Sequence, residues 1–185
     1  MLKKHFHGIV TEFDHPKNEK PVLLIANHFS WWDGFIGHYL SFKYFRKKFH
    51  VMMLREQLID RMFLNKAGAF SVEKSTRSVV ESLHYSAEIL SRDNNLLMMF
   101  PQGKIESQYH RDFLFEKGVE KILERCDPLP EVVFNVNLVD YFSNPAPTLF
   151  IRTKSYRAGL SAKELQDAFN RFHSECLSKQ HENLI

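Results

Sequence analysis

Cysteine and long apolar runs are scarce in this chain of 185 residues. Its two cysteines, Cys126 and Cys176, lack metal-type spacing and are too few for a disulfide framework, so we expect reduced core thiols. No apolar run exceeds about seven residues, whereas a membrane-spanning helix needs about 20. The first thirteen residues contain no apolar core of a signal peptide. These absences predict a cytoplasmic protein, with peripheral contact to the inner face of the membrane left open.

A strong excess of one sign of charge is also lacking. The formal net charge is +3, and the sequence carries no basic arm and no known nucleic-acid-binding module. This mild excess is too weak to predict a nucleic-acid partner, but it suits an anionic membrane surface or an acidic ligand. The length and the ordinary share of hydrophobic residues exclude a disordered chain. They predict a single domain over residues 1–185.

Phenylalanine is the residue in excess, at 17 positions. Many of these side chains must form the core, but aromatic residues beside Lys and Arg are also typical of proteins that rest on a bilayer. The segment 34–48 combines both features, because its apolar residues end in a cluster of four cations. Such cations suit a helix C-terminus and would also suit lipid head groups. The pattern alone favours a solvated helix face.

Short apolar runs alternate with helical patterns along the chain. Strands are predicted at 22–26, 50–54, 67–74, 96–100, 132–136 and 148–153. Helices are predicted at 34–48, 55–65, 76–92, 115–125 and 161–179. This alternation predicts an α/β fold, with a central mostly parallel or mixed sheet flanked by helices.

The first predicted strand leads directly into a histidine and a carboxylate. His28 and Asp33 stand five positions apart, which on a straight helix would turn them about 140° away from each other. They can meet only if His28 lies in the loop and Asp33 in the first helical turn. Ser30 and Asp33 fit a capping box, with Ser30 at the N-cap and Asp33 at N3.

A histidine held by a carboxylate is the usual general base for a hydroxyl group, because the carboxylate fixes the tautomer and favours the imidazolium. No serine or cysteine nucleophile accompanies this pair, so the direct interpretation is that His28 deprotonates a substrate alcohol. The alternative is that Asp33 only caps the helix and His28 is an ordinary loop histidine. Spacing alone favours this alternative.

Two further loops follow predicted strands. Glu73 and Lys74 either hold a charged head group or form a solvated strand end, and spacing alone favours the second interpretation. Gln102 and Gly103 offer turned backbone N–H groups, with Lys104 as a cation for an anionic group. Because sites of α/β sheets gather where strands end, we expect the three loops to lie together.

The chain has ten histidines, and histidine is the commonest metal ligand in proteins. His5 and His7 share one side of a short extended segment, but no carboxylate completes a ligand set at suitable spacing. We therefore expect no metal and no other resident cofactor.

Four segments resemble, in order and context, the motifs of the glycerolipid acyltransferase family, of the lysophosphatidic acid acyltransferase type. Residues 27–33 are similar to its first motif, Asn-His-x-Ser-x-x-Asp, and 68–74 to its second. Residues 100–103 resemble its third motif, Phe-Pro-Glu-Gly-Thr-Arg-Ser, and 115–118 resemble the Phe-Lys-x-Gly element that follows. The resemblance covers about residues 8–140.

This resemblance implies an O-acyltransferase with His28 as general base and Asp33 as its orienting partner. The donor would be an acyl thioester of coenzyme A or of acyl carrier protein, used as a co-substrate. The acceptor would be a lysolipid or another lipid-like alcohol, often held through its phosphate. The residues implied in acceptor binding are Glu73, Lys74, Gln102, Gly103 and Lys104.

The sequence departs from the family pattern in the second and third motifs. Gln102 stands where the family has Glu, which keeps a hydrogen-bonding shape but removes a charge. Ile105 and Lys74 stand where the family has Arg, and Lys binds phosphate only as a point charge. The acceptor therefore need not be lysophosphatidic acid. Two other classes stay open, a non-catalytic membrane-surface lipid-binding protein and a thioester or ester hydrolase.

Overall fold

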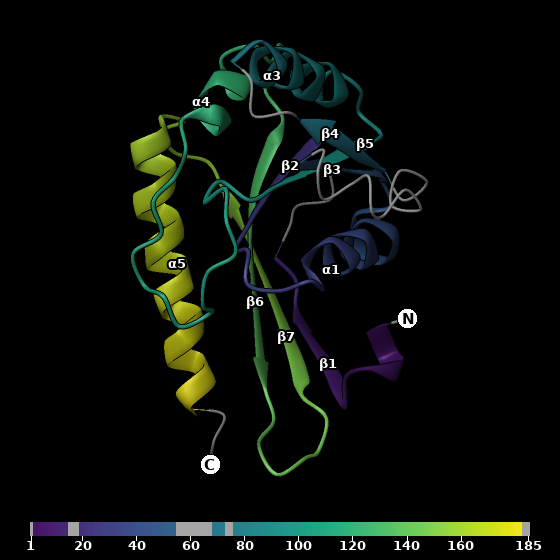
Figure 1. Cartoon of the computed structure of the whole chain (residues 1–185), viewed down its shortest axis with the longest axis vertical. Coiled ribbons are helices and arrows are strands. Elements are labelled where there is room, and N and C mark those ends of the chain that lie inside the picture. Colours follow the sequence, from purple (N-terminus) through teal and green to yellow (C-terminus); the bar gives the residue numbers. More distant parts are fainter. Residues whose placement is uncertain (1, 15–18, 55–67, 73–75, 183–185) are drawn as a thin grey trace.

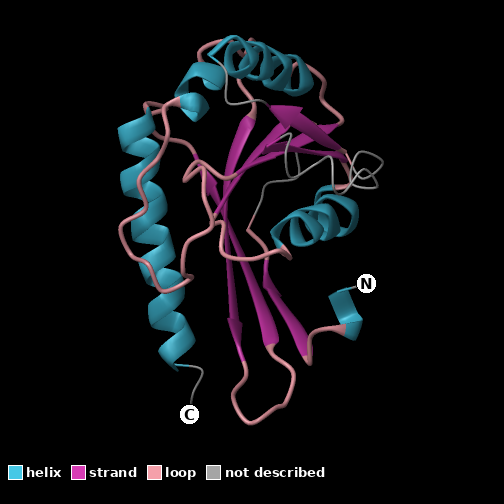
Figure 2. Ribbon diagram, viewed as in Figure 1, coloured by secondary structure: helices cyan, strands magenta, loops and turns pink. Residues whose placement is uncertain are grey.

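A central sheet organises the computed structural model, which describes residues 2–14, 19–54, 68–72 and 76–182 (Figure 1). Its strands are β1 (Gly8–Glu12), β2 (Val22–Ala26), β3 (Lys48–Leu54), β4 (Ala69–Val72), β5 (Asn95–Met99), β6 (Glu131–Asp140) and β7 (Thr148–Tyr156). Within the described ranges these seven strands form one sheet, in the order β1-β7-β6-β2-β5-β3-β4 (Figure 2). Neighbouring strands are parallel except β6 and β7. The predicted α/β fold with a mostly parallel, mixed sheet is confirmed.

Helices cover both faces of this sheet. They are η1 (Leu2–Lys4), α1 (Asp33–Leu40), η2 (Ser41–Phe45), α3 (Thr76–Leu90), α4 (Gly118–Leu123) and α5 (Ala162–Glu182). Side chains of α3, α4 and α5 pack into one hydrophobic cluster, and those of α1, η2 and the N-terminal segment pack into the other. Figure 1 shows α5 and α1 on opposite sides of the strands.

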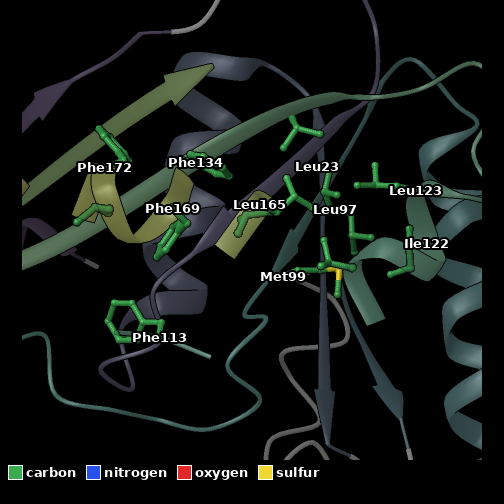
Figure 3. Close-up of a cluster of buried hydrophobic side chains, with 14 of the residues drawn as sticks. Leu23, Leu97, Met99, Phe113, Ile122, Leu123, Phe134, Leu165, Phe169 and Phe172 are labelled. Atoms are coloured by element: carbon green, nitrogen blue, oxygen red, sulfur yellow. The ribbon is translucent and has the colours of Figure 1, made fainter. Parts of the chain in front are cut away.

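Strand β2 lies between the two clusters, which explains its continuous apolar sequence. Leu23 and Ile25 point into the cluster beneath α5, whereas Leu24 points into the one beneath α1. A parallel strand covered on both faces has no solvated side for polar residues. Figure 3 shows Leu23 among side chains from other strands and helices, including Phe134 and Phe169. Leu23, Phe134 and Phe169 have almost no exposed surface.

Helix α1 is held close to the sheet by a glycine. Gly37 faces the sheet so closely that an added Cβ would collide with Met98 of β5 and with Phe49 of β3. This close approach fixes the axis of α1 relative to the strands. Asp33, the first residue of α1, is thereby placed beside the end of β2.

Several predicted boundaries are wrong. The helix predicted at 34–48 ends earlier, because α1 gives way to the π-helical turn η2, which Arg46 closes with a left-handed φ of 54°. Strand β1 was not predicted, since it is a partly exposed edge strand without an apolar run. Strand β6 extends to Asp140, well past the predicted end at residue 136. The helix predicted at 55–65 lies outside the described residues.

The two cysteines are free thiols, as expected. Cys176 is buried in the cluster beneath α5, and burial raises its pKa to about 12. Cys126 is half-buried, and burial raises its pKa as well. Both thiols are therefore protonated, weak nucleophiles at neutral pH.

His173 of α5 gives the fold a specific sensitivity to acid. The ring is fully buried, its centroid lies 4.7 Å from that of Phe113, and burial lowers its pKa to about 4. Between pH 6.5 and 4 the unfolded chain therefore binds a proton that the folded chain excludes, so stability falls as the pH falls. We expect this group to cost about 3 kcal/mol of unfolding free energy between pH 7 and pH 4.

Urea unfolding of the wild type and of His173→Phe at pH 7 and pH 4 measures this cost. The phenylalanine keeps a ring beside Phe113 but cannot take up a proton, so the variant should lose less stability on acidification. Other titrating groups are common to both proteins and cancel in the comparison. Equal losses in the two proteins would contradict the assignment.

Candidate active site

The first and third predicted site loops meet because their strands are neighbours. Strands β2 and β5 are parallel, and Ile25 near the end of one is paired with Met99 at the end of the other. Because the two strands are parallel, their carboxyl ends lie side by side, and this brings the following residues His28 and Gln102 together. Glu73 and Lys74, from the second predicted loop, lie outside the described residues.

His28 and Asp33 form a short hydrogen bond at this edge. The Nδ1 atom of His28 lies 2.7 Å from Oδ2 of Asp33. The carboxylate is buried, with 1% of its side chain exposed, whereas the His28 side chain is 23% exposed. His28 lies in the loop and Asp33 is the first residue of α1, which is the arrangement that the five-residue spacing requires.

The Asp33 carboxylate also organises the loop around it. Oδ2 accepts hydrogen bonds from the backbone N–H groups of Phe29 and Ser30, each at 2.9 Å. The Ser30 hydroxyl donates to Oδ1 at 3.3 Å and accepts from the N–H of Trp32 at 3.1 Å. The loop is therefore folded around one buried carboxylate.

The predicted capping box is wrong in its register. Trp32 occupies the N-cap of α1 and makes no capping hydrogen bond through its side chain. Asp33 is therefore N1 rather than N3, and Ser30 lies one tight turn before the helix. The reason is that Asp33 bonds to N–H groups that precede the helix, which closes a turn instead of extending the helix back to Ser30.

Burial dominates the electrostatics of the pair. It raises the pKa of the Asp33 carboxyl group above its ordinary value, while the hydrogen bonds from His28, Ser30 and Phe29 oppose the rise. The ionised carboxylate accepts the proton on Nδ1 of His28, which leaves the lone pair on Nε2. Nε2 is then the nitrogen that can take a proton from another molecule.

Phe100 supports the imidazole from its flat side. The rings of His28 and Phe100 are stacked, with centroids 4.4 Å apart and planes at 22°. Phe100 follows β5 directly, so its position is set by the sheet. The ring of His28 is thus held by a carboxylate at one nitrogen and by an aromatic face along its plane.

A buried asparagine network anchors the start of the loop. Asn27 donates to the carbonyl oxygen of Asn137 at 2.9 Å and accepts from its N–H at 2.8 Å. The side chains of Asn135 and Asn137 bond to each other. This network ties the end of β2 to β6. This network was not predicted from the sequence, although two asparagines within an apolar strand were its signal.

The Gln102 side chain of the third loop contacts the backbone of His28. Oε1 of Gln102 accepts the N–H of His28 at 2.7 Å, and Gln102 is itself buried. Gly103 has a φ of 68°, a conformation that favours glycine, and its N–H donates to the carbonyl of Phe100. The Lys104 ammonium lies 3.1 Å from Oε1 of Glu106, for which the sequence predicted no role.

A cavity of about 300 Å³ adjoins the first loop. It is formed by the N-terminal segment, by the loop after β2 and by residues near the β6–β7 turn, and most of its lining is aromatic or aliphatic. The lining residues are His5, Phe6, Phe29, Ser30, Trp32, Val139, Tyr141 and Pro147.

The described residues contain neither a metal-binding cluster nor a membrane-spanning helix. In the part of the chain that the structure describes, no group of three or more His, Cys, Asp or Glu side chains could hold a metal ion. Over the same residues, no helix combines the length and the apolar character needed to cross a membrane.

Comparison with known proteins bears on the same region. The family model described as Acyltransferase matches residues 8–139, which is more than half of the chain. No curated protein sequence gives a significant match. The matched segment contains the His28–Asp33 pair and the loop with Gln102. The chain therefore belongs to the Acyltransferase family, the family of the glycerolipid acyltransferases.

Proposed function

We propose that this acyltransferase moves a fatty acyl group from an acyl thioester to a hydroxyl group of a lysolipid or another lipid-like acceptor. The donor would be an ester of coenzyme A or of acyl carrier protein. The observation that carries the proposal is the 2.7 Å hydrogen bond between His28 and the buried Asp33. Such a pair prepares an imidazole to take a proton from an alcohol.

In the proposed reaction, Nε2 of His28 removes the proton of the acceptor hydroxyl as its oxygen attacks the thioester carbonyl carbon. The imidazolium is stabilised by Asp33, which stays ionised. The tetrahedral intermediate then collapses, the carbon–sulfur bond breaks, and the leaving sulfur takes the proton from His28. The products are an ester and a free thiol, and His28 returns to its starting state.

Two features support a lipid-like substrate. The cavity beside the first loop is lined by aromatic and aliphatic side chains such as Phe6, Phe29 and Val139 together with polar groups, a mixture that suits a lipid with a polar head group. Phe42 of η2 is 80% exposed, and Lys43 and Arg46 beside it are exposed as well. Aromatic and cationic side chains together suit the surface of an anionic bilayer. We therefore propose peripheral contact with the membrane from the cytoplasmic side.

A panel of acyl thioesters and acceptors tests the proposal. Purified protein is offered coenzyme A and carrier-protein thioesters with lysophospholipids, aminolipids and glycolipids, and products are read by mass spectrometry. We expect free thiol and one acylated acceptor in equal amounts. Free fatty acid without acylated product would indicate the hydrolase instead. Binding to anionic vesicles with no thiol release would indicate the lipid-binding protein.

A further inference from the structure

A closed ring of hydrogen bonds joins His28 to the third loop. The N–H of His28 donates to Oε1 of Gln102 at 2.7 Å, and Nε2 of Gln102 donates to Oε2 of Glu106 at 2.8 Å. The backbone N–H of Glu106 donates in turn to the carbonyl oxygen of His28 at 2.8 Å. The backbone of the histidine is therefore held at both its N–H and its C=O.

Glu106 sets the direction of the hydrogen bonds in this ring. The amide of Gln102 has one accepting and one donating end, and exchanging the two would place an N–H group against the N–H of His28. A carboxylate can only accept, so it forces the NH₂ end of Gln102 toward itself and the oxygen toward His28. Glu106 thus supplies, four positions later, the negative charge that Gln102 lacks.

The surroundings of Glu106 keep its side chain ionised. The hydrogen bond from Gln102 and the ammonium of Lys104 hold the pKa of this carboxyl group below its usual range. Lys104 and, more weakly, His110 are the charged or titratable groups that lower this pKa. Lys104 is 72% exposed, so its contribution is screened by solvent.

We propose that Glu106 is a positioning residue for His28, acting through the oriented amide of Gln102 and through its own N–H. The carboxylate fixes the direction of the hydrogen bonds of the Gln102 amide in the ring through Oε2, and its other oxygen, Oε1, forms an ion pair with Lys104. The kinetic part of this inference rests on the proposed function, because it is acyl transfer that needs a correctly placed imidazole.

Exchanging the residue types at positions 102 and 106 tests the inference, and the first step is the single variant Gln102→Glu. Gln102→Glu places a carboxylate against Glu106 where an amide donated before, so one of the two must take up a proton to keep the contact. We expect kcat at pH 8 to fall about 10- to 10²-fold and to recover partly on acidification, with little change in KM for the thioester.

The double variant Gln102→Glu, Glu106→Gln is the matched rescue. Its glutamine can donate to the new glutamate, whose other oxygen still accepts the N–H of His28, so kcat should return to within about threefold of the wild type. Arg77→Ala, which breaks an exposed ion pair with Glu81 on α3, is the control for loss of a surface cation and should stay close to the wild type. The inference is overturned if Gln102→Glu behaves as the wild type at every pH, or if the double variant is no better than Gln102→Glu.

Amide hydrogen exchange of His28, followed by NMR, tests the ring without reference to catalysis. The N–H should be protected in the wild type and in the double variant, and should exchange faster in Gln102→Glu at pH 8. If wild-type protein transfers no acyl group, the proposed function fails while this readout still decides the ring. If the His28 N–H were equally protected in Gln102→Glu, the proposed ring of hydrogen bonds would be contradicted.

Discussion

His28→Ala is expected to lower acyl transfer by at least ~10²-fold, which is the usual size of a general-base effect. The substitution removes the nitrogen that takes the proton but keeps the backbone N–H and C=O that bond to Gln102 and Glu106. Asp33 also keeps its hydrogen bonds from Phe29 and Ser30. The fold should therefore survive the loss of the imidazole.

Thiol release at saturating thioester, together with a urea unfolding curve, measures both halves of this expectation. His38→Ala is the matched control, because His38 lies on the exposed side of α1 and has no part in the site. It should leave turnover within about twofold of the wild type. A His28→Ala protein that is folded and fully active would exclude His28 as the general base.

The fold was largely predictable because the strands at its centre are buried on both faces. Leu23 to Ile25 and Leu96 to Met98 form continuous apolar runs, and such runs have few alternatives to a central parallel strand. The edge strand β1 gave no such signal, since all five of its residues are exposed or only partly buried. The predicted range of β6 ended too early, at residue 136, because Asn137 interrupts the apolar pattern of the strand.

The meeting of the first and third loops was predictable from the α/β pattern, but an individual side-chain contact was predictable only where its partners are close in sequence. His28 and Asp33 are five residues apart, so the geometry of a loop entering a helix already limits how they can meet. Asn27 and Asn137 are 110 residues apart, and only the register of β2 against β6 brings them into contact. Polar pairs of that separation leave no periodic trace in a sequence.

The third loop lies where the sequence predicted it, but Lys104 has a partner that the sequence did not predict. Lys104 was expected to attract an anionic group of the acceptor, and in the structure it is paired with Glu106. The Lys104 side chain is 72% exposed, so solvent weakens this ion pair and Lys104 keeps the freedom to turn toward a substrate. The roles of Gln102, Gly103 and Lys104 in acceptor binding remain proposals, as do those of Glu73 and Lys74.

Asp33→Asn is expected to separate catalysis from stability. The amide oxygen can replace Oδ2 and accept the same three N–H groups, and the NH₂ group can donate to the Ser30 hydroxyl oxygen in place of Oδ1. The shape of the loop and the tautomer of His28 are then kept. Only the negative charge that stabilises the imidazolium is lost, and we expect kcat to fall about 10²-fold or more.

The same substitution should not lower the unfolding free energy at pH 7. Burial raises the pKa of Asp33, so ionising this carboxyl group in the folded state costs stability as the pH rises through that pKa. A neutral amide removes this cost.

Kinetics and urea unfolding of Asp33→Asn, with exposed Asp167→Asn on α5 as the control, measure both effects. A variant as active as the wild type would show that the charge of Asp33 has no catalytic part. A variant that is inactive and clearly less stable would show that the carboxylate holds the loop together rather than assisting His28.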